Sequence, residues 1–590
     1  MYTYKLTKIK FNNDEEIQLG NLTVIIGPNN VGKSQILKDI VQRTTKQQPL
    51  PCVVVKDVEW IPPQSLEELC EAYSLECYQD TNNNWIFRTL EPELFQERQV
   101  NASFWDNLEH ISGYLNNKSN FAENFGFALL AFITTEYRLQ LVKESPSADH
   151  ERQEINLLQT LYNAGSSLEA EIQKLIKEAF GKEIKLDFTV PQRLRLRVGD
   201  DFSSIPSDPR DAKQPMQQFE KLDNQGDGIR SFVGIAIALL ATKRTVFLID
   251  EPEAFLHPPQ ASRIGRFIAE QASNKRQIVI TTHSVDVLRG ILNHTNDVKV
   301  IRVDRKHQIN HFNIPDPSIL KRLVNDPLLS SARVLDGLFY SGVVVVEADS
   351  DGRFYHIASD KRRNDIDLHF VNADNKQTVP RISTLYRDMG VRCVGIVDFD
   401  VLNDSTEFKK QLVALDLEKE TITSLLGIRE KIAAVAKELP LDERLKFTKV
   451  KITELLESLQ TLESKTFSSE YEEKSEKENL LREIERGAKE IADSNKKWKI
   501  FKQKGREALP TELQSEFDVL WGVCSQKGLF INPCGELESM LPSIPYTSNK
   551  RGWITDALTL LPSLKVDDNK YPWRFIKAIQ EYLVDIEDEQ

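Results

Sequence analysis

The segment from Val24 to Ser34 has residue types and spacing that are suited to binding phosphate. Its sequence, Val-Ile-Ile-Gly-Pro-Asn-Asn-Val-Gly-Lys-Ser, matches the pattern G-x-x-x-x-G-K-[ST]. Glycines let main-chain N–H groups turn toward phosphate oxygens, the lysine brings a charge to the β- and γ-phosphates, and the serine offers a hydroxyl to Mg²⁺. The segment therefore predicts binding of ATP with Mg²⁺. The residues expected to contact the nucleotide are Gly27, Asn29, Asn30, Gly32, Lys33 and Ser34.

An acidic pair, Asp250 and Glu251, directly follows the apolar run Val246 to Ile249. Nucleotide hydrolysis needs a magnesium ligand and a group that polarises the attacking water. We expect Asp250 to hold Mg²⁺ together with Ser34, and Glu251 to orient the water. The sequence Thr-Thr-His-Ser at 281–284 follows one strand later, which strengthens this interpretation.

A second set of carboxylates, far along the chain, could bind metal. Asp398 and Asp400 follow an apolar run at period-two spacing, which would place both side chains on one side of an extended segment. Carboxylates that cluster repel one another unless a cation neutralises them, and a pair of Mg²⁺ or Mn²⁺ ions suits phosphodiester cleavage. The expected metal ligands from these motifs are Glu347, Asp398, Asp400, Glu536 and Glu538.

The elements that must position the first set form an α/β domain. Apolar strands are predicted at 22–26, 246–249 and 277–280, with helices at 34–42, 227–240 and 260–273. Alternating strands and helices indicate a mostly parallel sheet, whose sites gather at the carboxyl ends of strands. Residues 60–180 contain the helical patches 121–132 and 167–180, and we interpret most of this segment as a helical insertion and a candidate dimerisation element.

The second set belongs to another α/β unit that begins near Leu338. Strands are predicted at 342–346, 368–372, 394–397 and 528–532, and a helix at 379–389. Residues 406–520 interrupt the unit with a highly charged stretch in which Leu and Ile recur. Paired long helices explain this recurrence, and a disordered charged linker is the alternative.

Arg193, Arg195 and Arg197 alternate along a predicted strand at 193–198, so they share one face of it. Two interpretations are open: a solvated sheet face, or a strip that contacts nucleic-acid phosphates.

Composition limits the classes of function. The chain has 590 residues with 76 basic and 89 acidic side chains, a net charge of −13, which argues against a uniformly basic nucleic-acid-coating surface. The six cysteines lack C-x-x-C spacing, so neither a zinc module nor a disulfide framework is indicated. No apolar run approaches the ~20 residues that span a bilayer, and no signal peptide is evident. We expect a cytoplasmic protein without membrane association.

The motifs of residues 1 to about 330 resemble the ATP-binding-cassette (ABC) type of ATPase, in the branch of chromosome-structure and double-strand-break-repair ATPases. The resemblance implies that His283 contacts the γ-phosphate and that residues 253–260 are exchanged across a homodimer. It also implies that the segment containing Gly226 and Gly228 closes over the nucleotide of the opposite subunit. This segment, Asn-Gln-Gly-Asp-Gly-Ile-Arg-Ser, departs from the usual Leu-Ser-Gly-Gly-Gln, which indicates a slow ATPase.

Residues 338 to about 560 resemble the Toprim domain of topoisomerases, primases and some nucleases. Joined to a cassette-type ATPase, this domain resembles the overcoming-lysogenization-defect (OLD) family of ATP-dependent nucleases. The resemblance implies metal-binding roles for Asp351 and Glu538, and a role for Lys550 in steadying the scissile phosphate, with an ordinary surface lysine as the alternative. Ala348 stands where the family's opening motif usually has glycine.

Two functions follow as hypotheses, with an ATPase domain at 1–330 and a Toprim domain at 338–590. The first is an ATP-regulated, metal-dependent endonuclease or nickase acting on double-stranded DNA in anti-phage defence, beside a helicase or a reverse transcriptase with its RNA–DNA product. The second is a non-nucleolytic, ATP-dependent nucleic-acid sensor or scaffold that recruits a partner. A topoisomerase would need an additional DNA-gate domain with a nucleophilic tyrosine, and a bacterial-type primase a zinc ribbon.

Overall fold

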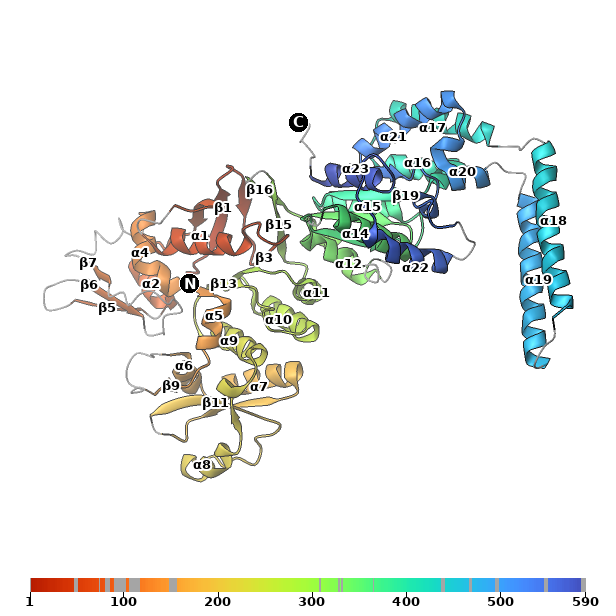
Figure 1. The fold of residues 1–590 in the computed structure, drawn as a ribbon. Helices are drawn as coiled ribbons and strands as arrows, with labels where there is room; N and C mark the ends of the chain where they lie inside the picture. The colour runs from red at the N-terminus through yellow and green to blue at the C-terminus, as the bar shows by residue number, and fades with distance from the viewer. Residues whose placement is uncertain are drawn as a thin grey trace. The chain divides into compact units, whose positions relative to one another are not determined.

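Apolar runs that end in polar residues become strands of a mostly parallel sheet and of a fully parallel sheet in the computed structural model of the protein (Figure 1). Contacts divide the chain into two units, residues 1–340 and 341–590. The residues that the structure describes are 2–46, 51–73, 75–79, 85–89, 102–104, 117–147, 156–190, 192–306, 309–326, 329, 333–363, 365–436, 441–465, 470–493, 498–545 and 550–584.

The main sheet of the first unit has six strands in the order β16-β15-β3-β14-β13-β8. Neighbouring strands are parallel except for β16, which runs antiparallel to β15. The strands predicted from apolar runs at 22–26, 246–249 and 277–280 are confirmed as three neighbours, β3, β13 and β14. The strand bounds are β3 Leu22–Ile26, β8 Leu130–Ile133, β13 Val246–Asp250, β14 Gln277–Thr281, β15 Lys299–Lys306 and β16 Ile309–Asn313.

Helices rich in buried aliphatic residues pack around this sheet, because each presents an apolar face to it. The three predicted helices are confirmed, with ends that differ by a few residues. In chain order the helices of the first unit are α1 Lys33–Thr45, α2 Leu66–Tyr73, α4 Lys118–Leu129, α5 Thr135–Gln140, α6 Leu157–Ala164, α7 Ser166–Phe180, α8 Pro209–Gln217, α9 Asp227–Ala241, α10 Pro258–Gln271, α11 Val285–His294 and α12 Pro317–Asn325.

The segment 60–180 is less helical than its sequence indicated. The helix predicted over 121–132 ends at Leu129, and the chain continues directly into β8, an edge strand of the main sheet beside β13. Residues 125–133 form one continuous apolar run that passes from the helix into the strand, so its periodicity does not separate the two. The segment also contains β5, β6 and β7, which form a small antiparallel sheet.

Two further antiparallel sheets complete the first unit. One has the order β2-β1-β4, and the other has the order β10-β11-β12 with β9 also paired to β11. The remaining strand bounds are β1 Leu6–Phe11, β2 Glu16–Gln18, β4 Val55–Trp60, β5 Leu75–Gln79, β6 Trp85–Thr89, β7 Ala102–Phe104, β9 Ser145–Pro146, β10 Glu183–Asp187, β11 Arg193–Gly199 and β12 Glu220–Lys221. A 3₁₀ turn at Leu222–Asn224 leads into α9, and another at Val334–Phe339 ends the unit.

The second unit contains a four-stranded, fully parallel sheet in the order β18-β17-β19-β20. The strands β17 and β19 lie at its centre, and their residues are entirely buried, as expected for continuous runs of valine and isoleucine. The four predicted strands are confirmed. Their bounds are β17 Gly342–Val346, β18 Leu368–Asn372, β19 Cys393–Val397 and β20 Leu529–Ile531.

A long helical segment separates β19 from β20 in the sequence. Within it, α18 and α19 lie side by side as two long helices (Figure 1), and Gly487 of α19 packs closely against Leu455 of α18. The helices of the second unit are α14 Asp349–Arg362, α15 Val379–Asp388, α16 Ser405–Ala414, α17 Lys419–Val435, α18 Leu441–Glu463, α19 Glu470–Asp493, α20 Trp498–Lys504, α21 Thr511–Gln526, α22 Lys550–Leu560 and α23 Trp573–Val584. Short 3₁₀ turns lie at Phe399–Asn403, Gly505–Ala508, Leu537–Met540 and Leu561–Ser563.

None of the helices in the described ranges combines the length and apolarity that crossing a bilayer requires.

Candidate functional site

The phosphate-binding loop lies between β3 and α1, where the main chain adopts conformations that favour glycine. Gly27 and Gly32 have φ values of 143° and 95°, and Asn30 has a φ of 61°. A Cβ atom at Gly27 would lie 2.1 Å from the carbonyl oxygen of Val303 in β15, so no larger residue fits there. Gly32 caps α1, whose first residues are Lys33 and Ser34, and Asn29 and Asn30 are exposed at the turn.

The Lys33 side chain is buried and turned back onto its own loop. Its Nζ donates to the carbonyl oxygens of Gly27 at 2.7 Å and Pro28 at 2.6 Å. Burial lowers the pKa of Lys33 to about 8, although the carboxylates of Glu251, Glu253 and Asp250 act in the opposite direction. The amine is therefore held within the loop, at the place where the motif requires a cation.

Glu251 and His283 meet at the carboxyl ends of the neighbouring strands β13 and β14. The Nε2 atom of His283 lies 3.1 Å from Oε1 of Glu251, and both side chains are about one-third exposed. The contact with His283 is the largest cause that holds the pKa of Glu251 below its ordinary value, and Lys33 adds to it. Asp250 accepts a hydrogen bond from the Thr281 hydroxyl on the adjacent strand. The structure thus brings together Lys33, Asp250, Glu251 and His283.

Two charged residues at this site, Arg138 and Glu253, were not predicted. Arg138 donates to the main-chain carbonyls of Asp250 and Glu251 at 2.9 and 2.8 Å. Glu253 accepts hydrogen bonds through Oε1 from the Thr282 hydroxyl at 2.8 Å and from the main-chain N–H of His283 at 2.6 Å. Burial raises the pKa of Glu253. The sequence assigned Glu253 to an exchanged loop, whereas its carboxyl group is turned inward to the end of β14.

The glycine-containing segment lies at the start of α9. Gly226 is the residue before the helix, and no atom lies within 4 Å of the position that its Cβ would take. At Gly228, a Cβ would lie 2.6 Å from the carbonyl oxygen of Phe255. Gly228 therefore allows α9 to pack against the loop after Glu251, while Gly226 borders open space.

In the second unit, Glu347 and Asp398 meet at the ends of the central strands. Oε1 of Glu347 accepts the main-chain N–H of Asp398 at 3.0 Å. Burial, together with Asp400 and Asp351, raises the pKa of Glu347 to about 7. Burial also raises the pKa of Asp398 well above its ordinary value, and the charges of Glu347 and Asp351 add to this. Two carboxyl groups in such a pair do not readily ionise together unless a cation compensates their negative charge.

Asp400 differs from its neighbours because two lysines contact it. Nζ of Lys376 lies 3.1 Å from Oδ1, and Nζ of Lys502 lies 2.8 Å from Oδ2. Burial raises the pKa of Asp400, but these lysines outweigh it and leave the pKa below its ordinary value. Lys502 was missed from sequence, because nothing in the charged sequence around α20 marks it.

The prediction that Asp398 and Asp400 project from one extended segment is wrong. The chain turns into a 3₁₀ helix at Phe399–Asn403, and Asp398 is its N-cap. Phe399, Val401 and Leu402 are all buried, and the burial of two consecutive residues, Val401 and Leu402, does not fit the alternation of a half-exposed strand. Asp398 and Asp400 still influence each other electrostatically, but the helical turn, not strand alternation, sets their directions.

The remaining predicted site residues of the second unit are Asp351, Glu536, Glu538 and Lys550. Asp351 and Glu536 lie close enough to affect the pKa of Asp398, and Glu538 is buried and borders a cavity of about 1650 Å³. Lys550 begins α22, but its side chain lies outside the described residues. In the ranges that the structure describes, no group of three or more His, Cys, Asp or Glu side chains has metal-binding geometry.

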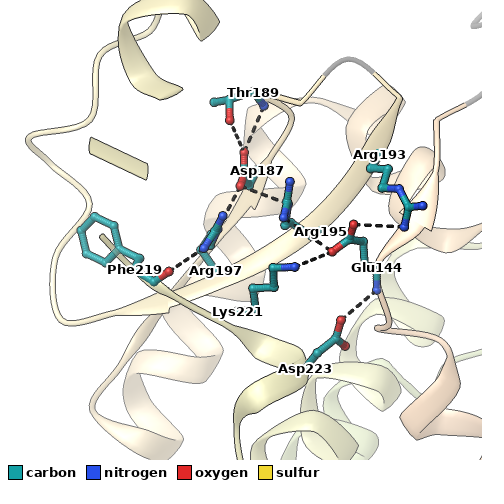
Figure 2. A network of polar contacts seen from close by, with 9 residues as sticks. All are labelled: Glu144, Asp187, Thr189, Arg193, Arg195, Arg197, Phe219, Lys221 and Asp223. Atoms are coloured by element: carbon teal, nitrogen blue, oxygen red, sulfur yellow. Dashed lines mark hydrogen bonds and ion pairs between the residues drawn. The ribbon is translucent and has the colours of Figure 1, made fainter. Parts of the chain in front are cut away.

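The arginines of β11 do not form a solvated face or a phosphate strip. Figure 2 shows Arg195 and Arg197 converging on the buried Asp187, at 3.4 and 2.9 Å respectively. Arg193 is the exposed member, and it pairs with Glu144 at 3.3 Å, as Arg195 does at 3.6 Å. Acidic partners therefore neutralise this side of the sheet from within the fold.

A family model supports the nucleotide-binding interpretation. Residues 127–289 match the model described as "AAA domain, putative AbiEii toxin, Type IV TA system". The matched range includes Arg138, Asp250, Glu251 and His283, and it excludes the phosphate-binding loop and the whole second unit. The first unit thus contains an ATPase domain related to the AAA class, and the narrower OLD and Toprim assignments stay predictions.

Individual relatives are distant. An uncharacterised protein of Methanocaldococcus jannaschii is 31% identical over 72 residues, which is 12% of this chain and 63% of that protein. Similar solved structures include an Smc head domain with an extended coiled coil, bound to the C-terminal domain of ScpA from Pyrococcus furiosus (10% identity, 55% of this chain and 99% of that chain, TM-score 0.33). The SMC head domain from Thermotoga maritima is also similar (14% identity, 52% and 98%, TM-score 0.26). We draw nothing further from scores of this size.

Proposed function

We propose that the first unit binds and hydrolyses ATP. The observation that carries this proposal is the 3.1 Å contact between Oε1 of Glu251 and Nε2 of His283 at the strand ends, close to the buried Lys33. Glu251 is ionised there, because its contact with His283 lowers its pKa. An ionised carboxylate can accept a proton from a water molecule, and the histidine can contact a phosphate oxygen.

The residues of the loop fit a nucleotide with Mg²⁺. Ser34 and Asp250 supply hydroxyl and carboxylate oxygens, which are the ligands that Mg²⁺ prefers. Lys33 is a buried cation held by two loop carbonyls, and a phosphate group offers it a stronger partner. When bound, Mg²⁺ would neutralise phosphate charge. The opening at Gly226 supports a homodimer in which the start of α9 faces a nucleotide on a second copy.

For the second unit we propose divalent-metal-dependent cleavage of DNA, as in Toprim nucleases of the OLD family. The supporting observation is the meeting of Glu347 and Asp398, two carboxyl groups with raised pKa values, at the ends of adjacent parallel strands. A divalent cation would relieve their mutual repulsion, and Mg²⁺ or Mn²⁺ fits an all-oxygen donor set. Lys376 and Lys502 would offer positive charge to a phosphate at the same place.

Plasmid nicking distinguishes this nuclease from a non-nucleolytic sensor or scaffold. We expect the wild type to nick plasmid DNA with Mg²⁺ or Mn²⁺, and Asp398→Ala to lose that activity while it still binds ATP. Equal cleavage by both proteins would reject the metal site, and DNA binding without cleavage by the wild type would favour the scaffold.

We further propose that the nucleotide state of the first unit regulates cleavage, which suits a defence effector. Such regulation requires two states with different affinities for nucleotide. The test is Lys33→Ala, which should abolish ATP binding and the response of nicking to ATP. Nicking that responds to ATP in this variant as in the wild type would contradict the coupling.

A further inference from the structure

Arg138 occupies a position from which it can set the geometry of Glu251. It lies in α5, directly after β8, the strand that pairs with β13. Its side chain is completely buried. Nη1 donates to the carbonyl oxygen of Asp250 at 2.9 Å and Nη2 to that of Glu251 at 2.8 Å. One planar guanidinium group therefore holds two consecutive main-chain carbonyls.

The main chain at Glu251 needs such support. Its φ is 47°, in the left-handed region that residues with side chains rarely occupy. Besides Arg138, the main-chain bonds that hold it are from the Glu251 N–H to the Thr281 carbonyl and from the Ala254 N–H to the Glu251 carbonyl, both at 3.0 Å. Without Arg138, two bonds that fix this turn disappear, and a change in φ would swing the Glu251 carboxylate away from His283.

The charge of Arg138 also matters at this position. Burial lowers its pKa to about 10, and the surrounding carboxylates of Glu253, Asp250 and Glu251 limit the decrease, so the guanidinium stays protonated at neutral pH. It places a fixed cation behind the carboxylates, on the main-chain side of the strand end. An uncharged residue of similar length would supply neither the two hydrogen bonds nor the charge.

The helix α9 holds Arg138 in place from the other side. A Cβ at Gly234 would lie 2.3 Å from the carbonyl oxygen of Arg138, so the two main chains are in direct contact. The same helix begins with the segment that contains Gly226 and Gly228.

We propose that Arg138 is a positioning residue for ATP hydrolysis. Arg138 holds the main chain of Asp250 and Glu251 so that the Glu251 carboxylate stays in contact with His283. This inference rests on the proposed ATPase activity. It assigns Arg138 to the hydrolysis step, because its two hydrogen bonds hold the main-chain carbonyls of Asp250 and Glu251.

The test compares steady-state ATPase rates and nucleotide binding of the full chain with those of Arg138→Met and Arg138→Lys. A misplaced catalytic group costs up to about a hundredfold in rate, so kcat should fall about ten- to a hundredfold in Arg138→Met. Its KM for ATP and its affinity for a non-hydrolysable ATP analogue should stay within about threefold. Arg138→Lys, which keeps the charge and can reach one carbonyl, should have an intermediate kcat and keeps the test available if Arg138→Met does not fold.

Arg197→Met is the matched control, because Arg197 is another buried arginine of the first unit that pairs with Asp187. It should lower Tm but keep the wild-type kcat below that Tm. Wild-type kcat in Arg138→Met, or an equal loss of kcat in Arg197→Met, would overturn the inference. A wild type that binds ATP without hydrolysing it would contradict the proposed function itself, and the inference would be rejected with it.

Discussion

Lys502 forms an ion pair with Asp400, with 2.8 Å between Nζ and Oδ2. Lys502 belongs to α20, which lies between the long helix α19 and α21 in the helical segment that separates β19 from β20. Its main-chain carbonyl also accepts the N–H of Glu536 at 2.8 Å. The helical segment is therefore connected to the carboxylates of the sheet through both a side chain and the main chain.

Removing this lysine should strengthen binding of a divalent cation. In Lys502→Met, Asp400 loses a competing cation, and because Lys502 is nearly half exposed the gain should be only about two- to fivefold in affinity. Calorimetric titration with Mn²⁺ would measure it. Lys504→Met, an exposed position on the same helix, is the control and should bind Mn²⁺ as the wild type does. Weaker binding in Lys502→Met would show that the lysine supports the cation indirectly.

Stability in the absence of divalent cations should fall as pH rises. The pKa of Glu347 is about 7 in the folded state and near 4.5 when unfolded, so the folded state binds more protons between these values. The free energy of unfolding should therefore decrease by roughly 3 kcal/mol from pH 4.5 to pH 7.5. Urea unfolding in EDTA would measure it. Glu347→Gln should reduce the dependence without abolishing it, because the raised pKa of Asp398 acts in the same direction. Mn²⁺ should restore stability at pH 7.5, whereas an unchanged slope in this variant would exclude Glu347 as a source.

Asp187→Ala should destabilise the first unit strongly. Asp187 is buried and compensates Arg195 and Arg197. Its loss leaves the buried Arg197 without its carboxylate and leaves Arg195 with Glu144 alone, at a cost of about 3–5 kcal/mol. Arg193→Ala, at the exposed end of the same network, should change the free energy of unfolding by less than about 1 kcal/mol. Chemical unfolding would measure both, and equal effects would contradict the asymmetry of the network.

Two helical glycines should respond to alanine in opposite directions. A Cβ at Gly234 would meet the Arg138 carbonyl at 2.3 Å, so Gly234→Ala should destabilise by about 1–3 kcal/mol. Gly427 in α17 has no atom within 4 Å of its Cβ position, so Gly427→Ala should stabilise by about 0.5–1 kcal/mol through helix propensity. Thermal unfolding would measure both, and a stabilising Gly234→Ala would contradict the close contact of α9 and α5.

Strands were predictable where they are buried on both faces, because a short, continuous apolar run with polar ends has few other structures to adopt. The phosphate-binding loop and the strand-end carboxylates followed from such runs. The strand β8 was missed, because it continues an apolar helix without a break in composition.

Contacts between segments distant in the sequence were not predictable from spacing. Arg138 is 112 residues from Asp250, and Asp187 pairs with arginines on the neighbouring strand. The alternation of Arg193, Arg195 and Arg197 correctly predicted that they share one face of the strand. It did not predict the carboxylates that pack against this face. Likewise, the spacing of Asp398 and Asp400 did not reveal that the chain turns into a 3₁₀ helix directly after Asp398.

The most direct test of the account is single-turnover ATP hydrolysis by the wild type and by Glu251→Gln, with nucleotide binding measured in parallel. Glutamine keeps the size of the side chain but cannot act as a base. We predict that Glu251→Gln binds ATP with Mg²⁺ as tightly as the wild type and hydrolyses it at least about a hundredfold more slowly. Hydrolysis at the wild-type rate in this variant would contradict the assignment of the site.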